Sequence, residues 1–310
     1  MAVTAAMVKE LREMTGAGMM DCKKALAATD GDMDKAVEFL REKGLAGAAK
    51  KAGRIAAEGI VMTKMAADEK TAVVVEVNAE TDFVAKNEKF QNYVADVAEQ
   101  ALASDAADMD AFMAEKWAKD ESLTVAEALS SQISIIGENM KIRRYEKLTA
   151  TAGFVASYIH AGGKIGVLVD VETDVVNDDI KEMARNVAMQ AAALKPLYTN
   201  RDEVDADYIE KEKEILTVAA KNEKPDANDK IISGMVMGRI NKELKEICLL
   251  DQVYVKAEDG KQSVSQYVAQ VAKANNAKVA IKKFVRFETG EGLEKKEENF
   301  ADEVAKQMGM

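Results

Sequence analysis

The sequence has very few of the residues that build metal sites, disulfide frameworks and sharp turns. Among its 310 residues are one histidine, two cysteines and two prolines. A zinc site made of histidine and cysteine, or a disulfide scaffold, requires more of these residues than the chain contains. So little proline favours long uninterrupted elements, mostly helices. The shortage of cysteine and the lack of a signal sequence predict a protein of the reducing cytoplasm.

Long hydrophobic runs and an excess of positive charge are missing too. A membrane-spanning helix needs roughly 18 or more apolar residues, and the best candidate, 153–171, is interrupted by His160, Gly162, Gly163 and Lys164. Acidic residues outnumber basic ones by 54 to 43, for a formal net charge of −11. Proteins that bind nucleic acids generally neutralise phosphates with lysine and arginine. The sequence therefore predicts no membrane span and no direct nucleic-acid partner.

The N-terminal part of the chain has the pattern of a small helical domain. Apolar residues occur at helical spacing in three segments, which are separated by turns at 15–18 and 30–32. We interpret residues 1–45 as a three-helix domain. Residues 46–58 are rich in alanine, glycine and lysine, a composition that we interpret as a linker.

The middle of the chain contains a pattern that occurs twice. In each copy a β-branched strand pattern precedes a helical pattern. Segments 73–84 and 165–176 align without gaps at an offset of 92 and share Glu-Thr-Asp-x-Val. We infer an internal duplication of two α+β halves, each with a strand pair and a covering helix. The two core subdomains are predicted to span 59–150 and 151–196 with 251–287.

Two further segments are predicted to be helical. Residues 197–250 carry two polar helical patterns around Pro225, which is typical of an inserted antiparallel hairpin. Residues 288–303 carry seven acidic and two basic residues, with Leu293 and Phe300 at helical intervals. This pattern predicts an acidic amphipathic helix within a C-terminal module at 288–310. The predicted fold class is α+β.

The common catalytic and cofactor motifs do not occur in the sequence. A more informative feature is the loop at 80–87, which follows the first repeated strand. In one interpretation, the commoner arrangement, Asp82 caps a helix and Phe83 packs in the core; in the other, both side chains form an exposed wedge that enters a partner. Met19 and Met20, beside a glycine turn, suit either packing within the small domain or an adaptable binding surface.

Several segments resemble the bacterial elongation factor Ts family, in order along essentially the whole chain. TGAGMMDCKKAL at 15–26 and TDFVAKN at 81–87 are the most specific, and IGENMKIRR at 136–144 fits the same family. The resemblance implies a nucleotide-exchange factor for elongation factor Tu, with no cofactor and no catalytic residue. It also implies an N-terminal ubiquitin-associated-like domain, a duplicated α+β core, a coiled-coil insertion and a C-terminal helix.

The resemblance also implies a mechanism and a set of partner-binding residues. In the family, the pair that corresponds to Asp82 and Phe83 enters the GTPase near its Mg²⁺ site. The ring separates helices, the carboxylate engages polar side chains, and GDP leaves. The residues implied are Thr81, Asp82, Phe83 and Val84 at the magnesium site, Arg12, Met19 and Met20 in the N-terminal domain, and Ile136, Gly137 and His160 in the core. A homodimer and a 2:2 assembly with the partner both stay open.

Two other functions are compatible with parts of the sequence. An adaptor that uses residues 1–45 alone would bind its target without Phe83. An enzyme that uses Asp82 and Asp174 as acid and base between the repeats would be active without a partner. The lack of a cofactor motif or a second histidine argues against this enzyme. The resemblance therefore favours an interaction protein.

Overall fold

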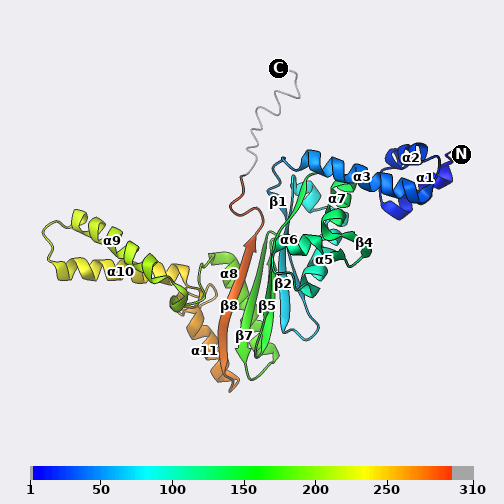
Figure 1. Ribbon diagram of the computed structural model, residues 1–310. Coiled ribbons are helices and arrows are strands. Elements are labelled where there is room, and N and C mark those ends of the chain that lie inside the picture. The colour runs from blue at the N-terminus through cyan, green and yellow to red at the C-terminus, as the bar shows by residue number, and fades with distance from the viewer. Residues whose placement is uncertain (1–2, 295–310) are drawn as a thin grey trace.

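Two three-stranded antiparallel sheets, packed face to face, form the centre of the computed structural model, which describes residues 3–294 (Figure 1). The strand orders are β1-β2-β5 and β6-β7-β8. The strands are β1 (Glu58–Met65), β2 (Thr71–Ala79), β5 (Met140–Thr149), β6 (Phe154–His160), β7 (Ile165–Thr173) and β8 (Val279–Glu288). A small ribbon of β3 (Lys116–Trp117) and β4 (Asp120–Thr124) lies outside these sheets.

Each central sheet is covered by helices on its outer face, so the core has four layers. Strand β2 is almost entirely buried because its odd-numbered valines face the helices and Val74 faces the other sheet. The first sheet packs against α5 (Glu88–Ala103), α6 (Met109–Ala114) and α7 (Val125–Ile136). The second packs against α8 (Asp178–Leu194) and α11 (Val264–Ala274). The predicted α+β class is confirmed.

A buried carboxylate joins the first sheet to the turn that follows β8. The Glu76 side chain is fully buried and accepts hydrogen bonds from Gly290 N–H at 2.8 Å, Arg143 at 3.0 Å and Arg144 at 2.6 Å. Burial alone would raise the pKa of Glu76, but these hydrogen bonds outweigh it and lower the pKa below its ordinary value. The last described residues are therefore tied to the sheet core through Glu76.

The N-terminal domain consists of α1 (Ala5–Thr15), α2 (Met19–Ala28) and α3 (Met33–Lys51) around its own small core. The predicted boundary at residue 45 falls inside α3, so only residues 52–57 of the predicted linker 46–58 lie outside regular structure. Alanine, leucine and lysine favour the helix. The helix α3 also packs against α7 at Gly44, where a Cβ would lie in ordinary van der Waals contact, 3.7 Å from Ser134 Cβ.

The predicted hairpin consists of α9 (Ala206–Glu223) and α10 (Asp229–Ile247), and it extends away from the sheets on the side opposite the N-terminal domain (Figure 1). Two short 3₁₀ turns, Arg201–Glu203 and Leu249–Asp251, flank it. Strand β8 ends at Glu288, which is the first residue of the predicted C-terminal module at 288–310. From residue 295 onward, the predicted C-terminal helix lies outside the described residues.

The two sheets share a layout, but the gap-free alignment of the repeats is wrong. Gly59 and Gly153 both have positive φ and press against a carbonyl of the neighbouring strand, and they lie 94 residues apart. The register shift of β2 against β5, between Glu76 and Val77, and that of β7 against β8, between Asp170 and Val171, have the same spacing. The N-caps of the covering helices, Asn87 and Asn177, lie only 90 residues apart. The first copy therefore contains four extra residues between strand and helix.

The first sheet also has a third strand, β5, which the predicted strand pair does not include. The sequence of β5, MKIRRYEKLT, is half charged and lacks an apolar alternation strong enough to predict a strand. It is an edge strand of the first sheet, where one side of the ribbon meets solvent. The charged side chains of β5 are therefore compatible with its position at the edge of the sheet.

Candidate functional site

The four extra residues of the first repeat form a single helical turn, α4 (Asp82–Ala85), directly after β2. We call this segment the Asp-Phe turn. Thr81, not Asp82, is its N-cap, and its hydroxyl accepts a hydrogen bond from Val84 N–H at 3.3 Å. Asp82 is instead the first helical residue and pairs with Lys86 at 2.6 Å. The hydrogen bond from Lys86 lowers the pKa of Asp82 below its ordinary value.

The Asp-Phe turn presents one aromatic ring to solvent and anchors itself with its other apolar residues. Phe83 is 80% exposed, the highest value among the large hydrophobic side chains identified as exposed in residues 3–294. Ala85 is buried, and Val84 packs against the core of the first sheet. Phe83 therefore does not pack in the core, contrary to the commoner of the two interpretations. An exposed aromatic on an anchored turn is suited to a protein contact.

The end of α7 lies against the Asp-Phe turn. Glu138 accepts hydrogen bonds from Thr81 N–H at 3.1 Å and from the Thr81 hydroxyl at 2.8 Å. Immediately before it, Gly137 is exposed and ends α7 with a φ of 90°, which favours glycine. Ile136 is half-buried against the first core. The structure thus brings the predicted residues Ile136 and Gly137 close to the predicted turn.

The β6–β7 hairpin contributes the second half of the core to the same region. Its Gly163 carbonyl accepts a hydrogen bond from Val61 N–H in β1 at 2.7 Å. Lys164 pairs with Glu58 at 2.5 Å, and its positive charge also contributes to the lowered pKa of Asp82. His160 is exposed at the end of β6. The hairpin that carries His160 therefore lies within electrostatic reach of the Asp-Phe turn.

His160 has no surrounding catalytic constellation in the described part of the chain. Its Nδ1 lies 3.0 Å from the Tyr158 hydroxyl on the same strand. Asp174, the other carboxylate considered as an acid or base, accepts a hydrogen bond from Lys278 N–H at 2.8 Å at the end of the second sheet. That contact gives Asp174 a role in closing the sheet.

The predicted N-terminal residues Arg12, Met19 and Met20 are all exposed, with Met19 at 56% and Met20 at 61%. Met14, which sequence reasoning missed, is exposed to the same degree. The turn between α1 and α2 touches the end of α7, since a Cβ at Gly16 would lie 3.3 Å from Ile135 Cδ1. The N-terminal methionines therefore belong to a domain that abuts the same helix end as the Asp-Phe turn.

Sequence reasoning also missed Lys86, Lys164 and Glu138. Glu138 could have been found because it directly follows the predicted pair Ile136 and Gly137 in the IGEN segment. Lys86 lies within the TDFVAKN segment, four residues after Asp82, a spacing that lets the two side chains pair on a helix. Lys164 carries no such signal, since surface lysines are common and their partners are set by the fold.

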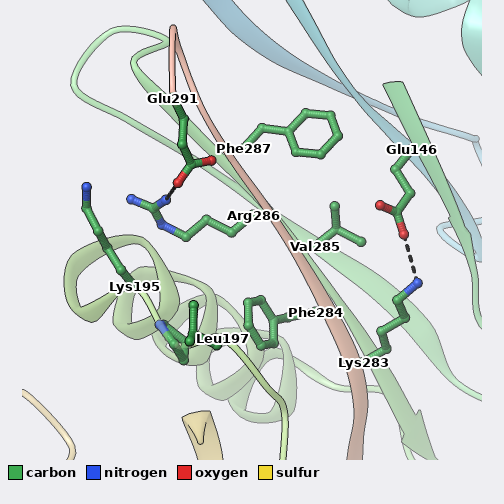
Figure 2. A pocket seen from close by; sticks show the side chains of 10 residues that line it. Glu146, Lys195, Leu197, Lys283, Phe284, Val285, Arg286, Phe287 and Glu291 are labelled. Carbon is green, nitrogen blue, oxygen red and sulfur yellow. Dashed lines mark hydrogen bonds and ion pairs between the residues drawn. The ribbon is translucent and has the colours of Figure 1, made fainter. Parts of the chain in front are cut away.

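A separate groove of about 570 Å³ lies beside β8, near the end of α8 (Figure 2). It is lined by ion pairs, including Lys283 with Glu146 and Arg286 with Glu291, together with the apolar side chains of Leu197 and Phe284. Within residues 3–294, no three potential metal ligands converge. None of the helices described is long and apolar enough to cross a bilayer. The exposed turn, rather than this groove, is the candidate functional site.

Comparisons with known proteins agree with the resemblance in the motifs. The chain matches the family described as Elongation factor TS over residues 80–291. It is 53% identical over 307 residues to the Elongation factor Ts of Clostridium novyi (strain NT). It is 55% identical over 306 residues to that of Clostridioides difficile (strain 630), and each alignment covers 99% of both chains. The chain therefore belongs to the elongation factor Ts family.

Proposed function

We propose that this protein is a guanine-nucleotide exchange factor that acts on elongation factor Tu during translation elongation. It binds the GDP-bound GTPase, inserts the Asp-Phe turn near the magnesium site and promotes release of GDP, so that GTP can bind. The observation that carries this proposal is the 80% exposure of Phe83 on a turn whose neighbouring residues are anchored. No covalent bond is made or broken in this process.

Exchange of this kind follows from binding linkage. A factor that binds the nucleotide-free conformation of a GTPase more tightly than the nucleotide-bound one must weaken nucleotide binding by the same factor. Phe83 supplies apolar area that becomes buried only when a gap between elements of the partner opens. Asp82 supplies a carboxylate that competes for polar groups near the bound Mg²⁺. Thr81 and Val84 hold this pair from either side.

The remaining predicted residues extend the interface. Arg12, Met19 and Met20 would contact the GTPase from the N-terminal domain, where flexible methionines adapt to an apolar helix surface. Ile136, Gly137 and His160 would contact it beside the Asp-Phe turn. We place the protein in the cytoplasm as a factor that needs no cofactor. In this proposal all of these residues contact the same GTPase molecule, which gives a 1:1 complex. A 2:2 assembly would require a further contact.

The proposal is tested by measuring release of a fluorescent GDP analogue from purified elongation factor Tu. The wild-type protein should accelerate release. Phe83→Ala should lower the release rate by roughly thirtyfold, which corresponds to the loss of about 2 kcal/mol typical of an aromatic hot spot. Asp82→Ala should also slow release. If the wild-type protein leaves the rate unchanged, the proposed function is wrong.

The matched control is Val176→Ala. Val176 is 50% exposed and lies just before the covering helix of the second sheet, in the shorter loop that joins β7 to α8 and lacks the four residues of the Asp-Phe turn. This variant removes exposed apolar area from the duplicate loop and should release GDP at the wild-type rate. Equal losses in Val176→Ala and Phe83→Ala would contradict the assignment of the wedge to the first copy.

A further inference from the structure

Side-chain hydrogen bonds join the segments that follow β2 and precede β5, next to the Asp-Phe turn, beyond the last backbone pair of these strands. The last backbone pair of β2 and β5 is Ala79 with Met140. At the next position, the Glu80 carboxylate accepts a hydrogen bond from Asn139 N–H at 2.6 Å. A side-chain oxygen thus replaces the backbone carbonyl where the strands begin to separate, which keeps a strand-end N–H satisfied.

One position farther from the sheet, a side-chain carboxylate again accepts hydrogen bonds across the two segments. Here the carboxylate comes from the segment before β5 rather than from the segment after β2, and it accepts two bonds. The Glu138 carboxylate takes Thr81 N–H with one oxygen and the Thr81 hydroxyl with the other, at 3.1 and 2.8 Å. The Thr81 hydroxyl in turn accepts from Val84 N–H. Glu138 is therefore linked through Thr81 to the backbone on both sides of Asp82 and Phe83. Hydrogen bonds to a carboxylate are stronger than those between neutral groups.

The second sheet offers a comparison within the same chain. Just beyond the last pair of β7 and β8, Asp174 accepts from Lys278 N–H at 2.8 Å, as Glu80 does from Asn139 N–H in the first sheet. The following position holds Val175 and Ala277, neither of which has a side-chain acceptor. The first carboxylate bond is common to both sheets and suits strand closure. The Glu138 bonds occur only in the sheet that carries the exposed Phe83.

The segment that presents Glu138 is itself firmly held. Gly137 ends α7 with its N–H bonded to the Ile133 carbonyl at 2.9 Å. Asn139 is buried, and its side-chain amide donates to the Arg54 carbonyl at 2.8 Å. Arg54 also pairs with Glu80. The carboxylate of Glu138 therefore projects from a fixed frame rather than from a free loop.

We propose that Glu138 is a positioning residue for nucleotide exchange, because its two bonds to Thr81 hold the Asp-Phe turn in the orientation that enters the GTPase. This inference rests on the proposed function. Holding the turn in its inserting geometry removes the ordering cost that would otherwise be met as the turn enters a GTPase already docked on the rest of the interface. Glu138 itself needs no contact with the partner.

The test is Glu138→Gln, which keeps the size of the side chain but replaces one acceptor oxygen with an amide donor. The release rate at saturating factor should fall by about tenfold, the effect of losing one hydrogen bond to a charged group. The factor concentration that gives half of the maximal rate should change by less than about twofold, because the rest of the interface is intact. Glu138→Asp keeps both carboxylate oxygens and should lose less activity.

The structural counterpart provides the control. Asp174→Asn weakens the analogous carboxylate bond at the end of the second sheet and should release GDP at the wild-type maximal rate. Thermal unfolding of both variants, followed by circular dichroism, shows whether each is folded. A similar loss of Tm in the two variants, with a lower release rate only in Glu138→Gln, is the expected pattern.

A double variant separates positioning from an independent contact. In the Phe83→Ala background, Glu138→Gln should lower the release rate by less than about twofold, since residues that act through one another are not additive. A wild-type maximal rate in folded Glu138→Gln, equal losses in Asp174→Asn, or fully additive losses with Phe83→Ala would each overturn the inference. If wild-type protein accelerates release and Phe83→Ala does not, those outcomes leave the proposed function intact.

Discussion

Replacing Phe83 by alanine should abolish most exchange activity while leaving folding stability almost unchanged. A fully enclosed phenylalanine buries roughly 200 Å². Phe83 is 80% exposed, so only about a fifth of that area, near 40 Å², is shielded from water in the free protein. At about 25 cal/mol per Å², the loss in the free energy of unfolding is about 1 kcal/mol at most.

Phe90 provides the contrasting substitution in the adjacent helix. Its side chain is fully buried in the layer between the first sheet and α5. Phe90→Ala should lower the free energy of unfolding by about 3–5 kcal/mol, since it removes buried area and leaves a cavity. Urea unfolding can be followed through the fluorescence of Trp117, which is 6% exposed and packs against Tyr93 in α5.

The comparison has a clear refuting result. If Phe83→Ala shifts the urea midpoint by an amount equivalent to more than about 2 kcal/mol at unchanged slope, the ring packs against the protein and is not a free wedge. A loss of exchange in that variant would then report partial unfolding. If Phe83→Ala is nearly as stable as wild type and yet has lost exchange activity, the free energy that the substitution removes belongs to the interaction with the GTPase.

Three further predictions concern the framework that holds the site. Glu76→Gln should lower the free energy of unfolding by about 3 kcal/mol at neutral pH, because it weakens a buried charge network. Because the pKa of Glu76 is lowered in the folded protein, the stabilisation that its carboxylate provides is complete above the ordinary carboxyl pKa and is lost as pH falls through the lower folded pKa. A difference in urea unfolding between wild type and Glu76→Gln that does not change with pH would contradict this. Gly166→Ala would place a Cβ 2.5 Å from Val61 Cγ1, in the interface between the two sheets. The free energy of unfolding should therefore fall by about 2 kcal/mol, with a lower Tm, because the sheets are forced apart. An unchanged Tm would show that the interface adapts freely. Cys22 and Cys248 are buried, and burial raises the pKa of Cys248 to about 11. Neither thiol should therefore react with a disulfide reagent until denaturant is added. Rapid labelling of the native protein would refute their burial.

Much of the secondary structure could be predicted because the determining signals are local. The α9–α10 hairpin follows from two apolar stripes and a proline between them, and its buried residues Ile232, Val236 and Ile240 belong to one of those stripes. The boundary at residue 45 could not be predicted, since α3 continues where Gly44 packs against α7. That contact joins segments far apart in sequence.

The repeats show the same division. Their shared strand and helix patterns are visible in the sequence, yet the gap-free alignment equates Thr81 with Thr173. In the structure Thr81 caps the Asp-Phe turn, whereas Thr173 is the last residue of β7. Strand register depends on which residues pair across the sheet, and Glu-Thr-Asp occurs in both copies at positions with different partners.

By itself, the sequence determined the α+β class, the hairpin and the family motifs, because apolar periodicity and short motifs are properties of neighbouring residues. Only the tertiary structure decided that Phe83 is exposed and that Glu138 reaches Thr81. Whether a side chain is buried depends on what the rest of the chain places over it, and here the remaining core covers Val84 and Ala85 but leaves Phe83 in solvent.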